Sequence, residues 1–208
     1  MKVSIPQKDG WIGKRTHGDD VNTFEKYQES EYYKAILKCS PNNRKLALDL
    51  GGHIGIMTRR MCQDFEHVHV FEPLFHEHIE KNVRYDNYTV HPYAVSNKEG
   101  SATMRVGQHH SAGSNIVTEK KGGQTYQDVP LVTIDSYDFK NVGFIKIDVE
   151  DHEYQALQGA QKTIKRYAPT IMIELKNDNT YYNDIMKFMN DLNYNNERIG
   201  ELDYVFFR

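Results

Sequence analysis

The chain has 208 residues, which predicts a single domain spanning residues 1–208, and its formal net charge of −3 comes from interspersed charges of both signs. Because no long basic run is present, nucleic acid is not expected as a partner. The hydrophobic share of 38% and the mean hydropathy of −0.72 are low, but 14 Tyr and 9 Phe can bury large areas. Every apolar stretch is far shorter than the roughly 20 residues of a membrane span.

The N-terminal sequence MKVSIPQKDGWIGKR is polar and lacks the apolar core of a signal peptide. Two cysteines, Cys39 and Cys62, do not make a disulfide framework. These features predict a cytoplasmic protein.

Residues 1–43 are predicted to form an arm, irregular over about the first 20 residues and helical over residues 22–38. Pro41 is expected to stop this helix. The helix is rich in aromatic residues, and we expect it either to cap an active site or to form the contact of a homodimer.

Residues 44–208 alternate between strands and helices. The predicted strands are residues 46–50, 67–71, 89–93, 144–149, 170–175 and 202–207. The predicted helices are residues 54–64, 75–84, 152–166 and 179–192. This alternation predicts parallel pairing with right-handed crossovers, and the apolar strands predict helices on both faces. We therefore expect an open, doubly wound α/β domain.

The alternation is interrupted before the fourth strand. Residues 101–106 and 128–134 are predicted to form two additional strands, a β-insert. Residues 107–127, which join them, are rich in Gly, Ser and His, and we expect a mobile loop or a partly ordered lid.

The first strand ends in a glycine loop, DLGGHIG at residues 49–55. Glycines let a ligand approach the backbone closely, and the N-terminus of the next helix favours a negative ligand group. A nicotinamide dinucleotide would prefer G-x-G-x-x-G, whereas this loop has G-G-x-x-G. Asp49 is suited to an ammonium group, so a ligand with an amino-acid end fits better. The alternative is a tight strand-to-helix turn that binds nothing.

The second strand ends at Glu72, 21 positions after Gly51 (72 − 51). An acidic side chain there can accept hydrogen bonds from both hydroxyls of a ribose, although it could also be a solvated strand terminus. The loop and Glu72 together indicate a nucleoside cofactor whose other end is cationic. S-adenosylmethionine fits that description.

Five segments resemble the FkbM family of S-adenosylmethionine-dependent methyltransferases. They are LDLGGHIG at 48–55, VFEP at 70–73, AVSN at 94–97, VTID at 132–135, and IKIDVEDHE at 145–153 with LQGA following at 157–160. The resemblance covers roughly residues 45–176. It implies a class I methyltransferase fold with a mostly parallel, seven-stranded Rossmann-like sheet, and an activity that is mostly O-methylation. Family members usually have Gly where this chain has Asp151, which adds a carboxylate to the site.

The resemblance implies a cofactor site in three parts. The loop of residues 49–55 would hold the methionine part, Glu72 the ribose, and the backbone of Ala94 and Val95 would border the adenine. The expected cofactor contacts are Asp49, Gly51, Gly52, His53, Gly55, Glu72, Ala94 and Val95.

Methyl transfer requires alignment of nucleophile, methyl carbon and sulfur, and can require removal of a proton from the acceptor. Asp148 and Glu150 flank the end of the fourth strand, and they would point the same way if the strand extended that far. We expect Asp148 to contact cofactor or acceptor, with Glu150 or Glu153 assisting. Glu153 could equally cap or salt-bridge the following helix.

No metal is expected, although a minority alternative is a magnesium or calcium site made of Asp148, Glu150 and Glu174. The histidines show no zinc spacing and are predicted to be solvated, with His53 in the glycine loop as the exception.

The predicted function is S-adenosylmethionine-dependent O-methylation of a small-molecule or sugar hydroxyl. One alternative is a methyltransferase that acts on a macromolecule, held in part by residues 1–43. The others are a non-catalytic S-adenosylmethionine-binding protein and an NAD-dependent oxidoreductase, which the glycine spacing disfavours.

Overall fold

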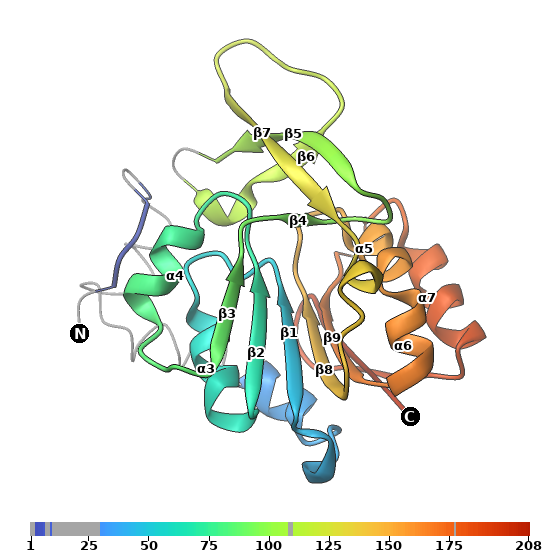
Figure 1. Cartoon of the computed structure of the whole chain (residues 1–208). Coiled ribbons are helices and arrows are strands. Elements are labelled where there is room, and N and C mark those ends of the chain that lie inside the picture. The colour runs from blue at the N-terminus through green and yellow to red at the C-terminus, as the bar shows by residue number, and fades with distance from the viewer. Residues whose placement is uncertain (1–2, 7–8, 10–29, 108–109, 177) are drawn as a thin grey trace.

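A computed structural model describes residues 3–6, 9, 30–107, 110–176 and 178–208. Its centre is a seven-stranded sheet of order β10-β11-β9-β8-β1-β2-β3, in which β11 runs antiparallel to its neighbours β9 and β10 and the other neighbouring strands pair in parallel (Figure 1). The strands are β1 Leu46–Leu50, β2 His67–Phe71, β3 Tyr88–His91, β8 Val142–Ile147, β9 Thr170–Glu174, β10 Asn195–Arg198 and β11 Asp203–Phe207. The doubly wound, mostly parallel fold is confirmed.

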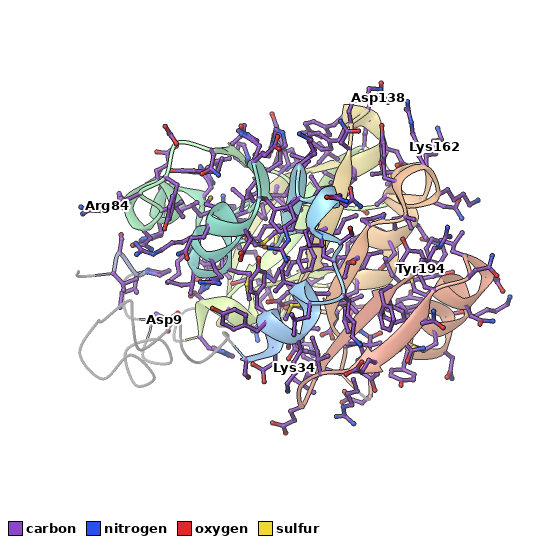
Figure 2. All side chains as sticks on the ribbon, turned by 90° about the horizontal axis from the view of Figure 1, so that it is seen from below. Asp9, Lys34, Arg84, Asp138, Lys162 and Tyr194 are labelled. Carbon is purple, nitrogen blue, oxygen red and sulfur yellow. The ribbon has the colours of Figure 1, made fainter. Side chains whose placement is uncertain are left out.

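Helices cover both faces of this sheet, as Figure 1 shows. They are α3 Ile56–Asp64, α4 His76–Asn82, α5 Glu153–Gly159, α6 Gln161–Tyr167 and α7 Tyr182–Asp191, with a further helical stretch at residues 30–36 and short 3-10 turns at Pro41–Asn43 (η1) and Ile134–Tyr137 (η3). Of the predicted helix over residues 22–38, residues 22–29 lie outside the described part. Figure 2 shows Lys34 on the helical stretch 30–36, where its ammonium donates to the carbonyl of Ile199 at 2.6 Å.

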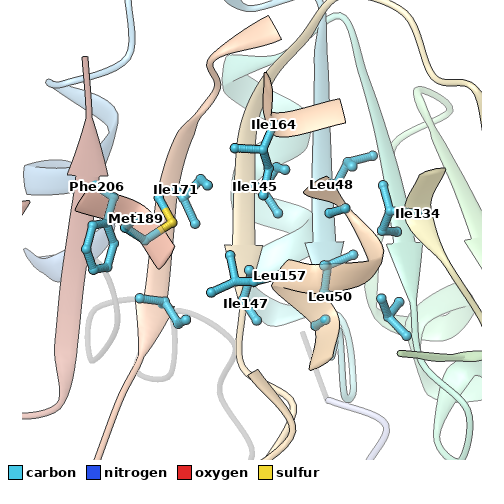
Figure 3. Close-up of a cluster of buried hydrophobic side chains, with 14 of the residues drawn as sticks. Leu48, Leu50, Ile134, Ile145, Ile147, Leu157, Ile164, Ile171, Met189 and Phe206 are labelled. Carbon is cyan, nitrogen blue, oxygen red and sulfur yellow. The ribbon is translucent and has the colours of Figure 1, made fainter. Parts of the chain in front are cut away.

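Side chains alternate between two cores because successive strand residues face opposite ways. On β1, Leu48 and Leu50 pack into the cluster that includes Leu157 and Ile164 (Figure 3), while Ala47 faces the other cluster. The second cluster joins α3, α4 and the helical stretch 30–36 to the opposite face of the sheet. These two apolar layers fix the position of each strand end.

Several element ends differ from the prediction by a few residues, and two differences bear on the site. The strand predicted over residues 144–149 ends at Ile147, because Glu150 and Asp151 adopt left-handed backbone conformations with φ of 51° and 69°. The single helix predicted over residues 152–166 is two helices, α5 and α6, which meet at Ala160 with φ −110° and ψ 7°.

The predicted β-insert is a separate four-stranded sheet of order β4-β7-β5-β6, set above the main sheet in Figure 1. Its strands are β4 Ala94–Val95, β5 Gly100–Val106, β6 Asn115–Val117 and β7 Thr125–Val132. The stretch of residues 107–127 contains more regular structure than expected. A 3-10 turn (η2, Ser111–Gly113), β6 and the start of β7 fall within its described part, because β6 pairs with β5.

Within the described ranges, no helix combines the length and the apolar character that a bilayer span would need.

Gly159 offers a test of the packing between α5 and the insert. A Cβ atom at this position would lie 1.9 Å from the carbonyl oxygen of Ser96, which follows β4. We expect Gly159→Ala to lower the free energy of unfolding by about 1–3 kcal/mol in chemical denaturation, because overpacking forces backbone shifts. A Cβ atom added to Gly122 would have no neighbouring atom within 4 Å, so Gly122→Ala is the matched control. Equal stabilities of the two variants would contradict this packing.

Candidate functional site

A pocket of about 600 Å³ lies at the carboxyl ends of the parallel strands, where open α/β sheets bind ligands. Loops after β1, β2, β8 and β9 line it, together with residues of the insert and of the segment before β11. Glu72, Asp148 and Glu174, each at or next to the carboxyl end of a strand, are among its lining residues. Asp49, near the end of β1, is not among them.

The glycine loop is tightly enclosed by neighbouring strands. Gly51 has φ of 84°, and a Cβ there would lie 1.8 Å from the carbonyl oxygen of Asp148. A Cβ on Gly52 would lie 2.1 Å from Cγ2 of Val70. Gly55, with φ of 88°, is the N-cap of α3. Packing against the end of β8 and against β2 therefore requires glycine at positions 51 and 52, whether or not a ligand approaches the loop.

Asp49 is fully buried and is not among the pocket-lining residues. Its Oδ2 accepts a hydrogen bond from the hydroxyl of Thr58 at 2.6 Å. Its Oδ1 lies 3.5 Å from Nζ of Lys146, which does line the pocket. In this conformation Asp49 influences the pocket through Lys146 rather than by direct contact.

Glu72 is a buried carboxylate that fastens two loops. Oε2 accepts the backbone N–H of His53 at 2.9 Å, and Oε1 accepts those of Leu74 at 2.8 Å and Phe75 at 3.1 Å. Burial raises the pKa of Glu72, while these backbone donors oppose that rise. A carboxylate accepts roughly four hydrogen bonds, so about one position remains for a ribose hydroxyl, where the sequence suggested two.

His53 joins the glycine loop to η2. Its Nε2 lies 2.6 Å from the hydroxyl of Ser111, whose backbone N–H donates to Oδ2 of Asp9 at 2.8 Å. Loss of solvation lowers the pKa of His53 to about 4, so its ring is neutral at pH 7. His53 lines the pocket and holds a segment from the insert against the loop.

The end of the pocket beside the insert is apolar. Ala94 and Val95 of β4 line it together with Leu74, Met104 and Ile116, and all but Val95 belong to one hydrophobic cluster. Sequence reasoning identified Ala94 and Val95 but not Met104 and Ile116. These two come from β5 and β6, and only the pairing within the insert brings them to the pocket.

The opposite end of the pocket is acidic. Asp148, Glu150, Glu174 and Asp203 all line it. Asp148 raises the pKa of Glu174 to about 8, and burial raises the pKa of Asp203 to about 6. Sequence reasoning missed Asp203, which reaches the site because antiparallel β11 pairs it directly with Glu174.

Lysines balance part of this charge. Nζ of Lys146 lies 3.2 Å from Oδ2 of Asp148, and Nζ of Lys176 lies 2.8 Å from Oε2 of Glu150. In the described part of the chain, no group of three His, Cys, Asp or Glu side chains is placed to hold a metal ion. Of the three carboxylates in the alternative magnesium or calcium site, Asp148 and Glu150 each face an ammonium.

Glu153 lies behind the turn rather than in the pocket. Its Oε1 accepts the backbone N–H groups of Val149 at 3.3 Å and Asp151 at 3.1 Å, and its Oε2 accepts from the side chain of Asn179 at 3.0 Å. Burial raises its pKa to about 7. The turn is held by this carboxylate. Because β8 ends at Ile147, the alternation argument for Asp148 and Glu150 does not apply.

The sequence pattern of the methyltransferase FkbM domain matches residues 49–195. Among solved structures, an FkbM methyltransferase from Methylobacillus flagellatus KT is similar with a TM-score of 0.57 and 18% identity over 79% of this chain. This chain covers 44% of that protein's length.

An rRNA methylase from Streptococcus thermophilus has a TM-score of 0.51 and 8% identity, over 86% of this chain and 93% of that one. A precorrin-8w decarboxylase from Methanobacterium thermoautotrophicum has a TM-score of 0.51 and 11% identity, over 86% and 87%. At these identities the likeness shows the fold. No curated protein matches the chain.

Glu174 predicts a pH dependence of stability. Its pKa rises from 4.5 to about 8 on folding, so the stability that it contributes is complete below pH 4.5 and is lost as the pH rises through 8. Glu174→Gln cannot ionise. We therefore expect the free energy of unfolding of the variant, measured with urea, to increase by at least about 1 kcal/mol relative to that of wild type as the pH rises from about 5 to about 8. Glu119→Gln, on an exposed loop, should show no such gain. A parallel pH dependence in wild type and Glu174→Gln would contradict the assignment.

Proposed function

Because the chain belongs to the FkbM methyltransferase family, we propose that it transfers a methyl group from S-adenosylmethionine to a hydroxyl oxygen of a small molecule or sugar. The observation that carries this proposal is the composition of one pocket. An apolar end, a buried carboxylate at Glu72 and an acidic end follow one another along it.

The pocket suits a nucleoside with a cationic tail. Met104 and Ile116 offer an apolar surface to a purine, and Glu72 has a remaining acceptor position for a ribose hydroxyl. The backbone of the loop at Gly51 and Gly52 lies open to the pocket where the methionine part would bind. When bound, this cofactor supplies an electrophilic methyl group on a sulfonium centre.

Asp148 is the residue that we assign to the acceptor proton. Its Oδ2 faces the ammonium of Lys146 at 3.2 Å, which orients the carboxylate, and we assign the proton to Oδ1. Glu150 is paired with Lys176 at 2.8 Å and assists by holding the turn and shaping the acidic end. Glu153 supports Asp148 indirectly through the turn.

The acidic end also bears on the class of acceptor. Carboxylates at Asp148, Glu150 and Asp203 repel phosphate groups, which disfavours a nucleic-acid backbone and favours a neutral or cationic small molecule. A macromolecular acceptor remains the second candidate, and an assay across sugars, small alcohols, peptides and RNA separates the two.

Calorimetry with S-adenosylhomocysteine tests the cofactor assignment. We expect one molecule to bind per chain, and Glu72→Gln to weaken binding at least about tenfold, because a hydrogen bond to a charged group is lost. Glu80→Gln, an exposed change on α4, should bind as wild type does. The absence of binding at millimolar concentration, or preferential binding of NAD, would refute the proposal.

Asp148→Asn tests the assignment of the base. At saturating methyl donor we expect turnover to fall by about 10²–10⁴-fold, with affinity for S-adenosylhomocysteine retained. Asp151→Asn is the matched control, because Asp151 is exposed and does not line the pocket. Full turnover in Asp148→Asn would remove Asp148 from the chemistry.

A further inference from the structure

Lys146 is a buried lysine, and burying its charged ammonium is energetically unfavourable unless the charge is compensated. It lies on the interior strand β8, opposite Asp49 of β1, and is only 6% exposed. Its ammonium donates to the carbonyl of Gly51 at 2.9 Å and lies 3.2 Å from Oδ2 of Asp148 and 3.5 Å from Oδ1 of Asp49. Burial alone would lower the pKa of Lys146, but Asp148 and Asp49 outweigh it and raise the pKa, so the ammonium stays charged.

Asp49 depends on this ammonium. Oδ2 accepts from Thr58, but Oδ1 is buried without a hydrogen-bond partner among the described residues. The nearest compensation for its charge is Lys146, which Asp148 shares. Two carboxylates and one ammonium give a formal charge of −1 (−2 + 1) directly beneath the glycine loop.

Neighbouring groups leave this balance in place at neutral pH. Glu150 is paired with Lys176 at 2.8 Å. Glu174, with a pKa of about 8, is mostly protonated at pH 7. Asp203, with a pKa of about 6, is mostly ionised at pH 7 and adds a separate negative charge beside these groups. Asp49, Lys146 and Asp148, which we call the Lys146 network, carry a formal charge of −1 of their own.

We propose that the Lys146 network distinguishes a sulfonium cofactor from its neutral thioether product, and that Lys146 is the positioning residue that sets the network's net charge at −1. The inference rests on the proposed function. A charge of −1 offsets one positive charge on a ligand that has lost its hydration in the pocket. A neutral sulfur gains nothing from it.

The same charge stays balanced through the reaction. The acceptor oxygen bonds to the methyl carbon while the electron pair of the broken carbon–sulfur bond remains on sulfur, which becomes neutral. Asp148 takes the acceptor proton, so the network's charge changes from −1 to 0 in the same step. The charges of the network and of the sulfur centre therefore sum to zero before and after transfer, and the network no longer attracts the ligand once its sulfur is neutral.

The test is the ratio of two dissociation constants measured by calorimetry, that of S-adenosylhomocysteine divided by that of S-adenosylmethionine. The two ligands differ by the methyl group and the charge on sulfur. Asp148→Asn brings the network to 0 and should lower the ratio by roughly tenfold or more. Lys146→Met brings it to −2 and should raise the ratio. Lys146→Arg and the exposed Lys45→Met should keep the wild-type ratio within about threefold.

A charge-matched double variant covers the case in which Lys146→Met fails to fold, since breaking a buried pair is strongly destabilising. Lys146→Met combined with Asp49→Asn removes both buried partners and restores −1, so it should retain the wild-type ratio. A structural role for Lys146 would weaken both ligands alike and leave every ratio unchanged, which would overturn the inference. Failure of the wild type to bind either ligand would instead refute the proposed function.

Discussion

The site depends on the close contact between the end of β1 and the end of β8. Gly51 packs so tightly against the carbonyl of Asp148 that any side chain would collide with it, and the ammonium of Lys146 holds the Gly51 carbonyl from below. This contact fixes the glycine loop, the first residue of the acidic turn and the floor of the pocket in one arrangement. The two apolar layers on either face of the sheet support it by setting the register of β1 against β8.

The pocket changes chemically from one end to the other, and the order of strands explains this. The β3 side carries the insert, whose apolar side chains Met104 and Ile116 meet Ala94. The β9 side receives three carboxylates from the ends of β8 and β9 and a fourth from the antiparallel β11. Glu72 lies between the two, with its carboxylate fastened by backbone N–H groups. A ligand that is apolar at one end and cationic at the other is therefore favoured in a single orientation.

The strands and the acidic strand ends could be predicted from the sequence because both are local features. Apolar runs bounded by Gly, Pro or charged residues fixed the strands to within a few residues, and the carboxyl-end rule then selected Glu72 and Asp148. The role of Lys146 and the position of Asp203 in the pocket could not be predicted. Both depend on the register between strands that are far apart in sequence. The end of the fourth strand was predicted too late for a local reason: Val149 continues the apolar pattern, although the backbone turns at Glu150.

We propose that one pocket holds the whole cofactor between the insert and the acidic turn. A crystal structure with bound S-adenosylhomocysteine would test this placement. We expect a ribose hydroxyl hydrogen-bonded to Glu72, the adenine against Met104 and Ile116, and the sulfur on the side of Gly51 that faces Asp148. A nucleoside bound elsewhere, or bound without contact to Glu72, would refute the placement.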